Sequence, residues 1–216
     1  MKAGVLASGG GTNLQSLIDH WQQGALAPAE LTVVGANLAA AFALERAAAA
    51  GIPTFVLSHK SFASREDFDR ALVAELRSRG VELVVLAGFM RVLTPAFLDA
   101  FPHRVINIHP ALLPAFPGTH AQKQALDYGV KLSGCTVHFV DAGTDTGPII
   151  AQAAVPVLPD DDEDDLRDRI LAEEHRLLPA VVRAVAAGQV TVEGRRVRVA
   201  GTGLPTVPHL RSLDRV

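Results

Sequence analysis

Cysteine is almost absent from this sequence, and long hydrophobic runs are absent altogether. Cys135 is the single cysteine in 216 residues, so an internal disulfide and a cysteine-based metal cluster are both excluded. No stretch approaches the roughly 18 consecutive apolar residues of a membrane-spanning helix. The apolar residues before Ser8 are too few for a signal peptide. We therefore expect a cytoplasmic protein without a membrane-spanning segment and without a bound metal ion.

A strong excess of charge of either sign is also missing. The formal net charge is −3, which gives no reason to expect nucleic acid or an anionic membrane as a partner. The hydrophobic fraction of 49% and the charged fraction of 20% are typical of a folded globular chain. We expect small-molecule substrates, and the sequence leaves open whether the protein is a monomer or a homodimer.

Apolar stretches and helical patterns alternate through the first half of the chain, as in a doubly wound α/β domain. The stretch 81–87 is almost continuously apolar, which is typical of a strand buried on both faces of a parallel sheet. Two later strands, at 132–140 and 149–157, are expected to pair with each other. We predict one α/β domain over residues 1–200, with a mostly parallel sheet, flanking helices and an antiparallel C-terminal portion. Residues 201–216 are expected to form a loosely held tail.

A glycine-rich loop follows the first strand and leads into a helix. Residues 8–13 are Ser-Gly-Gly-Gly-Thr-Asn. Glycines let the backbone approach a ligand closely, and the start of a helix offers free N–H groups to a phosphate. The loop lacks the Lys-Ser/Thr of a Walker A sequence and the third glycine of a dinucleotide fingerprint, so a phosphomonoester fits it better than NAD. The alternative is a plain tight turn in which Thr12 or Asn13 caps the helix.

The stretch 105–147 carries the polar residues best suited to catalysis. Asn107 and His109 lie two apart on an otherwise apolar strand, so their side chains project from the same face. An amide beside an imidazole suits a reaction in which negative charge builds on a carbonyl oxygen while a proton moves. The glycine-rich loop at 141–147 supplies Asp145, a carboxylate that could orient the imidazole. We interpret this stretch as a site for acyl transfer.

Several other polar residues have both a functional and an ordinary interpretation. Thr136 and His138 share one face of a later strand and are interpreted as residues that support the site. Cys135 falls on the other face and is interpreted as an inert core thiol. Arg65 opens a helix and could reach a ligand, although an arginine there is more often solvated. Glu174 falls on the flank of the long late helix, where exposure to solvent is the ordinary expectation.

The most specific signal is Asn-x-His-Pro at 107–110, followed by Asp-x-Gly-Pro at 145–148. It is accompanied by Ser-Gly-Gly-Gly-Thr-Asn at 8–13, Leu-Ala-Gly-Phe-Met-Arg at 86–91, Pro-Gly-Thr-His at 117–120 and Val-His-Phe-Val at 137–140. In this order the motifs resemble the phosphoribosylglycinamide formyltransferase family over roughly residues 1–190. The resemblance implies a formyltransferase fold, with a phosphate-binding half at about 1–100 and a folate-binding and catalytic half at about 101–190.

The resemblance also implies roles for individual residues. The catalytic group would be Asn107, His109 and Asp145. Glycinamide ribonucleotide would be bound by Gly11, Thr12, Asn13 and Glu174. The expected co-substrate, 10-formyltetrahydrofolate, would be bound by Arg65, Met90, Arg91, Val92, Leu93, Asn107, Asp141 and Asp145.

The implied reaction is direct attack of the substrate amine on the formyl carbon. Asn107 and a protonated His109, whose pKa Asp145 would raise, would stabilise the anionic oxygen. A methionyl-tRNA formyltransferase is less expected, because nothing basic or long enough to bind RNA follows the late helix. A formyltetrahydrofolate hydrolase normally has an additional N-terminal domain and has no use for a phosphate loop. A non-catalytic phosphometabolite-binding module is the alternative from a different class.

Overall fold

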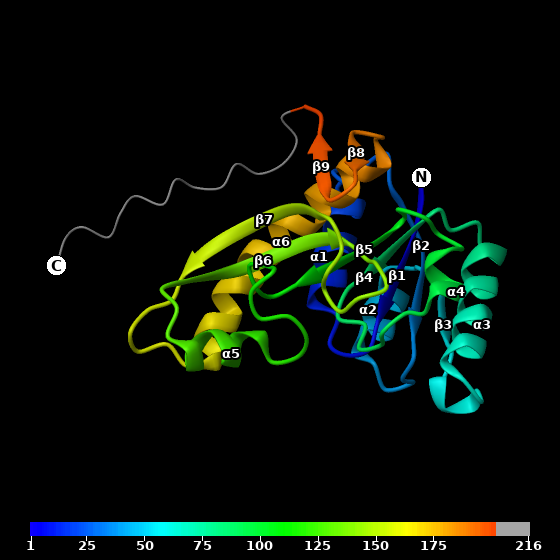
Figure 1. Cartoon of the computed structure of the whole chain (residues 1–216). Helices are drawn as coiled ribbons and strands as arrows, with labels where there is room; N and C mark the ends of the chain where they lie inside the picture. The colour runs from blue at the N-terminus through cyan, green and yellow to red at the C-terminus, as the bar shows by residue number, and fades with distance from the viewer. Residues whose placement is uncertain (202–216) are drawn as a thin grey trace.

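The computed structural model describes residues 1–201, which form one main sheet with helices on both faces (Figure 1). The seven strands of this sheet lie in the order β3 (Thr54–Val56), β2 (Glu30–Ala36), β1 (Lys2–Ala7), β4 (Leu83–Leu86), β5 (Val105–His109), β6 (Leu132–Phe139) and β7 (Ile149–Pro156). Strands β1 to β5 run parallel, and β6 is antiparallel to both of its neighbours. The predicted mostly parallel sheet with an antiparallel C-terminal portion is confirmed.

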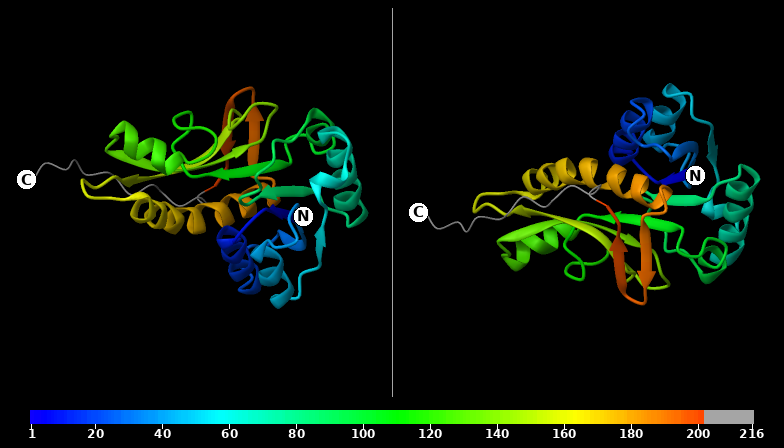
Figure 2. Two further views of the ribbon diagram at one scale, coloured as in Figure 1. Left: turned by 90° about the horizontal axis from the view of Figure 1, so that it is seen from below. Right: turned by 90° about the horizontal axis from the view of Figure 1, so that it is seen from above.

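Two hydrophobic clusters pack the helices against the sheet. The larger cluster joins the sheet to α1 (Thr12–Gln22), α2 (Phe42–Ala49) and α6 (Glu163–Ala186). The smaller cluster joins the sheet to α3 (Arg65–Ser78) and α4 (Pro95–Leu98). Figure 2 shows α6 running beside α1 along one side of the sheet. Helix α5 (Ala121–Tyr128) also contacts α6. A short 3-10 helix, η1 (His59–Ser61), precedes α3.

Side-chain caps fix where two of the helices begin. The Ser64 hydroxyl accepts the N–H of Asp67 at 3.0 Å and starts α3. Asp162 and Asp165 accept each other's backbone N–H groups at the start of α6, which is a capping box. Carboxylates at the start of α6 therefore cap this helix. Helix α6 continues through Pro179 to Ala186.

A small hairpin ends the described part of the chain. Its strands are β8 (Val190–Glu193) and β9 (Arg196–Val199), and β9 packs beside β7. The tail predicted at 201–216 lies outside the described residues except for Gly201. Within residues 1–201, no helix is long and apolar enough to cross a membrane.

The position of β1 in the sheet determines where ligands can bind. The chain leaves β1 for β2 on one side, whereas β4 lies on the other side. In open α/β sheets, ligands bind beyond the carboxyl ends of the strands at such a reversal. The loops that follow β1 and β4 are Ser8–Gly11 and Ala87–Thr94, and both border cavities.

Candidate active site

In the glycine loop after β1, one glycine packs against α2 and the other two border open space. Gly11 caps α1 in the left-handed conformation, with φ of 71°. A Cβ at Gly11 would lie 2.8 Å from the Cβ of Ala43, so the position has no room for a side chain. By contrast, Gly9 and Gly10 face open space. No side chain caps α1, so the alternative in which Thr12 or Asn13 forms the cap is wrong.

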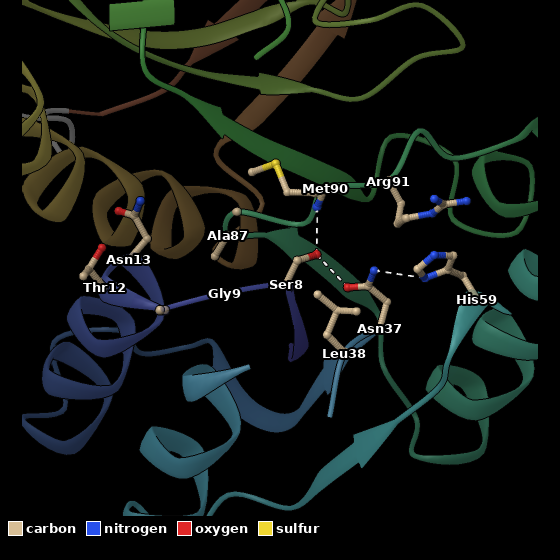
Figure 3. A pocket seen from close by; sticks show the side chains of 13 residues that line it. Ser8, Gly9, Thr12, Asn13, Asn37, Leu38, His59, Ala87, Met90 and Arg91 are labelled. Atoms are coloured by element: carbon tan, nitrogen blue, oxygen red, sulfur yellow. Dashed lines mark hydrogen bonds between the residues drawn. The ribbon is translucent and has the colours of Figure 1, made fainter. Parts of the chain in front are cut away.

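A cavity of about 460 Å³ opens above this loop (Figure 3). Its lining residues are Ser8, Gly9, Gly10, Gly11, Thr12, Asn13, Asn37, Leu38, His59, Ala87, Gly88, Met90 and Arg91. The Ser8 hydroxyl donates to Asn37 Oδ1 at 2.6 Å and accepts the N–H of Met90 at 2.9 Å. These bonds join the ends of β1, β2 and β4 into one wall of the first cavity.

Glu174 lies directly behind the glycine loop, on the inner face of α6. Its side chain is 3% exposed, so the expectation of an exposed position is wrong. Asn13 Nδ2 donates to Glu174 Oε2 at 2.7 Å. Burial raises the pKa of the Glu174 carboxyl to about 7, because this single hydrogen bond only partly offsets the loss of water. Glu174 lies four residues after Ile170 and three before Leu177, so helical periodicity places it on the buried face of α6, which packs against α1.

A second cavity, of about 560 Å³, lies beyond the ends of β4, β5 and β6. Its apolar wall includes Leu86, Phe89, Met90, Val92, Leu93, Ile108 and Val140. Its polar residues include Arg91, Asn107, His109, His138, Asp141 and Asp145. Gly88, Met90 and Arg91 border both cavities, so the two spaces share one wall.

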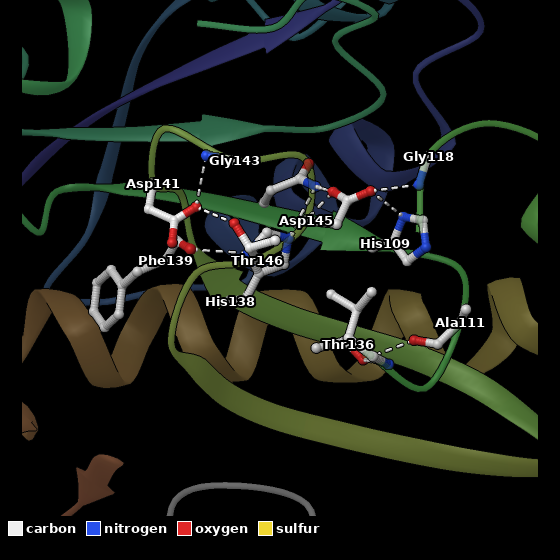
Figure 4. Close-up of polar contacts among 12 residues, drawn as sticks. His109, Ala111, Gly118, Thr136, His138, Phe139, Asp141, Gly143, Asp145 and Thr146 are labelled. Carbon is white, nitrogen blue, oxygen red and sulfur yellow. Dashed lines mark hydrogen bonds and ion pairs between the residues drawn. The ribbon is translucent and has the colours of Figure 1, made fainter. Parts of the chain in front are cut away.

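The predicted catalytic residues converge at the polar end of this second cavity (Figure 4). Asp145 Oδ2 lies 3.3 Å from His109 Nδ1 and accepts the N–H of Gly118 at 2.8 Å. Asn107 Nδ2 donates to Asp145 Oδ1 over 3.4 Å, and His138 Nε2 lies 3.6 Å from the same oxygen. Asp145 has a left-handed backbone with φ of 54°, which is costly for a residue other than glycine. Its contacts therefore hold a loop conformation that the backbone alone disfavours.

Backbone carbonyls hold one nitrogen of each histidine ring. His138 Nδ1 donates to the carbonyl of Phe139 at 2.9 Å, while His138 Nε2 lies 3.2 Å from Asn107 Nδ2 and 3.6 Å from Asp145 Oδ1. His109 Nε2 faces the carbonyl of Phe116 at 2.8 Å and therefore carries a proton. A neutral His109 has no second proton for Asp145. The pair of His109 and Asp145 can thus accept one more proton between them.

The pKa values of this pair differ in part from the expectation. Burial lowers the pKa of the His109 imidazole, and it outweighs the Phe116 carbonyl and the Asp145 carboxylate, which raise it. Asp145 acts in the predicted direction, but burial disfavours the charged ring more than Asp145 favours it, so a protonated His109 during the reaction stays a prediction. Burial also acts to raise the pKa of Asp145, but the His138 imidazole, the Gly118 N–H and the nearby His109 together lower it.

Two further residues hold the loops of the site. The Thr136 hydroxyl is buried, donates to the carbonyl of Ala111 at 2.7 Å and accepts the N–H of Leu113 at 3.0 Å. Asp141 accepts the N–H of Gly143 and the hydroxyl of Thr146, which closes the loop around Asp145 (Figure 4). At the end of this loop, a Cβ on Gly147 would overlap the carbonyl oxygen of Phe139.

Comparison with known proteins agrees with this geometry. Residues 1–182 match the formyl transferase family. The chain belongs to the formyl transferase family. It is 51% identical over 191 residues to the phosphoribosylglycinamide formyltransferase of Mycobacterium tuberculosis. The aligned residues cover 88% of this chain and 87% of that relative. It is also similar in structure to glycinamide ribonucleotide transformylase 1 from Symbiobacterium toebii, with a TM-score of 0.90 and 53% identity over 92% of this chain and 93% of that chain.

Some relatives are much longer than this formyl transferase. The trifunctional purine biosynthetic protein adenosine-3 of Drosophila melanogaster is 50% identical over 192 residues, which cover 88% of the chain. The chain spans only 14% of the length of that relative. The match therefore concerns one part of a larger protein.

One predicted residue of this formyl transferase does not join the site. Arg65 is exposed at the start of α3 and lines neither cavity, so its role in binding the donor stays a prediction. Among residues 1–201, no group of three or more histidine, cysteine or acidic side chains is arranged to hold a metal ion.

Sequence reasoning missed several groups that complete the site. The Phe116 carbonyl and the Gly118 N–H contact His109 and Asp145, and both are backbone atoms. The only signal for them was the proline-rich loop that crosses the site after β5. His59 joins the wall of the first cavity through a 3.3 Å contact with Asn37 Nδ2, and nothing in its local sequence indicates that position.

Proposed function

We propose that this formyl transferase transfers the formyl group of 10-formyltetrahydrofolate to the primary amine of 5′-phosphoribosylglycinamide, a step of de novo purine synthesis. The observation that carries the proposal is the convergence of Asn107, His109 and Asp145 at one end of the second cavity. The names of the M. tuberculosis and S. toebii relatives support the choice of substrate.

The second cavity fits a folate donor. Its volume of about 560 Å³ is within the usual range for small-molecule sites. Met90 and Val92 are 67% and 51% exposed, so an apolar surface is available to a flat aromatic ring. We assign Met90, Arg91, Val92, Leu93 and Asp141 to donor binding because they line this cavity. The polar end of the cavity then receives the formyl group.

The first cavity fits a phosphorylated amine. The free N–H groups at the start of α1 and the open space over Gly9 and Gly10 favour a phosphate at Gly11, Thr12 and Asn13. Glu174 would act on this ligand by fixing Asn13 from behind, because it does not line the cavity itself. Because the two cavities share the wall at Met90 and Arg91, an amine held in the first can approach a formyl carbon held in the second.

Asn107 and His109 supply the stabilisation that the reaction needs. Attack of the amine on the formyl carbon turns the formyl oxygen into an anion. The Asn107 amide donates only a long 3.4 Å hydrogen bond to Asp145, so little is lost when it donates to that oxygen instead. The His109 Nε2–H is held by the Phe116 carbonyl, so His109 becomes the second donor through Nδ1 once the His109–Asp145 pair takes up a proton. The Asn107 donor is in place before the reaction begins, which lowers the barrier because it needs no reorganisation.

Asp145 and His109 handle the proton. The attacking nitrogen becomes cationic when the new C–N bond forms, and it must lose one proton. The His109–Asp145 pair has room for that proton between Nδ1 and Oδ2. The resulting imidazolium would be held by the Phe116 carbonyl and the Asp145 carboxylate. The pair then returns the proton to the folate nitrogen as its bond to the formyl carbon breaks, so the enzyme ends unchanged.

An assay with both substrates tests the proposal. The protein is mixed with 10-formyltetrahydrofolate and 5′-phosphoribosylglycinamide, and the loss of the formyl donor is followed spectroscopically. We expect conversion that depends on the amine and gives one formylated product for each donor consumed. Conversion without the amine would instead indicate a formyltetrahydrofolate hydrolase. Binding of both compounds without any conversion would indicate a non-catalytic binding module.

A further inference from the structure

The segment 88–94, called the dividing wall below, includes the residues that border both cavities and has almost no regular structure of its own. It follows β4 as an irregular segment, and its internal hydrogen bond joins the N–H of Arg91 to the carbonyl of Phe89 at 2.9 Å. Among the described residues, two side chains bind its backbone from outside. Ser8 accepts the N–H of Met90, and Asp69 accepts the N–H of Thr94. The shape of this dividing wall therefore depends on a few polar contacts together with the packing of Phe89 and Leu93 in the smaller hydrophobic cluster.

Asp69 is the more unusual of these two anchors. It lies on α3, lines neither cavity and is 1% exposed. Acidic side chains are almost never fully buried unless they are paired. The Asp69 Oδ2 atom accepts the Thr94 N–H at 2.6 Å, and Thr94 is itself only 4% exposed. A short, buried bond to a carboxylate is among the stronger hydrogen bonds in proteins.

The electrostatic surroundings connect Asp69 to the same wall. Burial raises the pKa of the Asp69 carboxyl, while the Thr94 N–H and the charge of Arg91 lower it. Arg91 borders both cavities, and its Nε atom is buried without a hydrogen-bond partner among the described residues. The carboxylate therefore lies behind the cationic part of the wall and holds its far end.

We infer that Asp69 is a positioning residue for the formyl donor: from outside the cavities it fixes the end of the dividing wall against which the donor lies. The inference rests on the proposed function, because it assigns the second cavity to the donor. Asp69 lines neither cavity, so its loss should act on donor binding only through the wall. The cluster of Asn107, His109 and Asp145 comes from other elements and should stay in place.

Replacement of Asp69 tests this role through the kinetic parameters. In Asp69→Ala, the buried Thr94 N–H loses its acceptor, and we expect KM for 10-formyltetrahydrofolate to rise about tenfold. We expect kcat and KM for 5′-phosphoribosylglycinamide to change by less than about threefold. Asp69→Asn keeps an acceptor oxygen at the same place and should recover most of the loss in KM.

A matched variant separates positioning from general stability. Leu76 lies on the same helix, is fully buried and belongs to the same hydrophobic cluster as the inner face of the wall. Leu76→Ala should lower Tm at least as much as Asp69→Ala, yet leave KM for the donor unchanged. A folded Asp69→Ala protein with wild-type KM for the donor would overturn the inference. The inference would also be overturned if Leu76→Ala raised KM for the donor as much as Asp69→Ala does.

Two further measurements keep the inference testable if Asp69→Ala does not fold. Hydrogen exchange of the wild-type protein should show a strongly protected Thr94 amide, and exchange at the rate of an exposed loop amide would overturn the inference. Calorimetric titration with tetrahydrofolate, which cannot react, measures donor-site binding directly in Asp69→Asn. A wild-type protein that binds no tetrahydrofolate would contradict the proposed function, whereas rapid exchange at Thr94 contradicts the role of Asp69 alone.

Discussion

The two carboxylates of the site, Asp145 and Glu174, lie in regions with opposite electrostatics. Asp145 is half-buried in a loop where a backbone N–H, an amide and two imidazoles surround it, and its pKa is lowered. Glu174 is buried inside a packed helix with one donor, Asn13, and its pKa is raised to about 7. Burial disfavours both charges. The number of donors around each oxygen decides which carboxylate stays ionised.

This difference suits the two regions to different tasks. Asp145 has a lowered pKa and lies beside His109, so this region suits the proton uptake that we propose. Glu174 carries a proton for much of the time near pH 7 and positions Asn13 by a hydrogen bond. The proposed proton transfer by Asp145 needs several polar neighbours, whereas Glu174 needs only one hydrogen bond to position Asn13.

The largest effect should follow from removing the charge of Asp145. Asp145→Asn keeps the size of the side chain and an acceptor for the Gly118 N–H, but it can no longer take up a proton. We expect kcat to fall by about 10²–10⁴, the usual contribution of a proton-transfer group. Steady-state kinetics with both substrates checks this. Asp127→Asn, an exposed change on α5, is the control, and a kcat within tenfold of the wild type would contradict the assignment.

A somewhat smaller effect is expected for the imidazole. His109→Ala removes one donor to the anionic oxygen, which should reduce kcat by about 10²–10³. Binding of tetrahydrofolate should stay nearly normal, because the apolar wall of the second cavity is unchanged. Calorimetry beside turnover measurements separates the two. Near-normal turnover in His109→Ala would show that the role of His109 is misassigned, and His20→Ala, on α1, serves as the histidine control.

The smallest effect concerns the stability of the other region. The Glu174 carboxyl has a pKa of about 7 in the folded protein, above the ordinary glutamate value of 4.5. Between these values the folded state holds a proton that the unfolded state has released, so its contribution to stability falls as pH rises from about 4.5 to 7. The full loss is on the order of 3 kcal/mol.

Glu174→Gln removes this titration and keeps an oxygen for Asn13. Denaturant unfolding at pH 5 and pH 8 should show the wild-type protein losing more stability between the two values than the variant does. All other titrating groups are common to both proteins. The change in the free energy of unfolding between pH 5 and pH 8 should therefore differ between them only by the contribution of Glu174. Equal pH dependence in both proteins would mean that the Glu174 carboxyl is already ionised at pH 5.

The two regions also differ in how far the sequence predicts them. The glycine loop is local: three glycines after a strand and before a helix predict both its position and its open space. Asn107 and His109 are local as well, since their spacing on one strand sets their common face. These parts of the site can be predicted from residues that are close together in the sequence.

Other parts depend on contacts that the sequence does not display. The hydrogen bond between Asn13 and Glu174 joins residues 161 positions apart and forms because α1 packs over α6. The protonation of His109 depends on the depth of its pocket, which outweighs the carboxylate that the sequence does show. Asp69 looks like an ordinary polar residue of an amphipathic helix until Thr94 is placed against it. Tertiary packing decides all three.

The close contact between Gly147 and the Phe139 carbonyl limits the length of the loop at 141–147, which carries Asp145. Where Gly147 meets the Phe139 carbonyl, two backbones touch and no side chain can be inserted between them. Asp141 ties the other end through Gly143 and Thr146. One inserted residue adds about 3.5 Å of chain, whereas the Asp145 carboxylate lies 3.3 Å from the imidazole. Insertions and deletions should therefore be tolerated in the surface turns of this protein but not between these two ties.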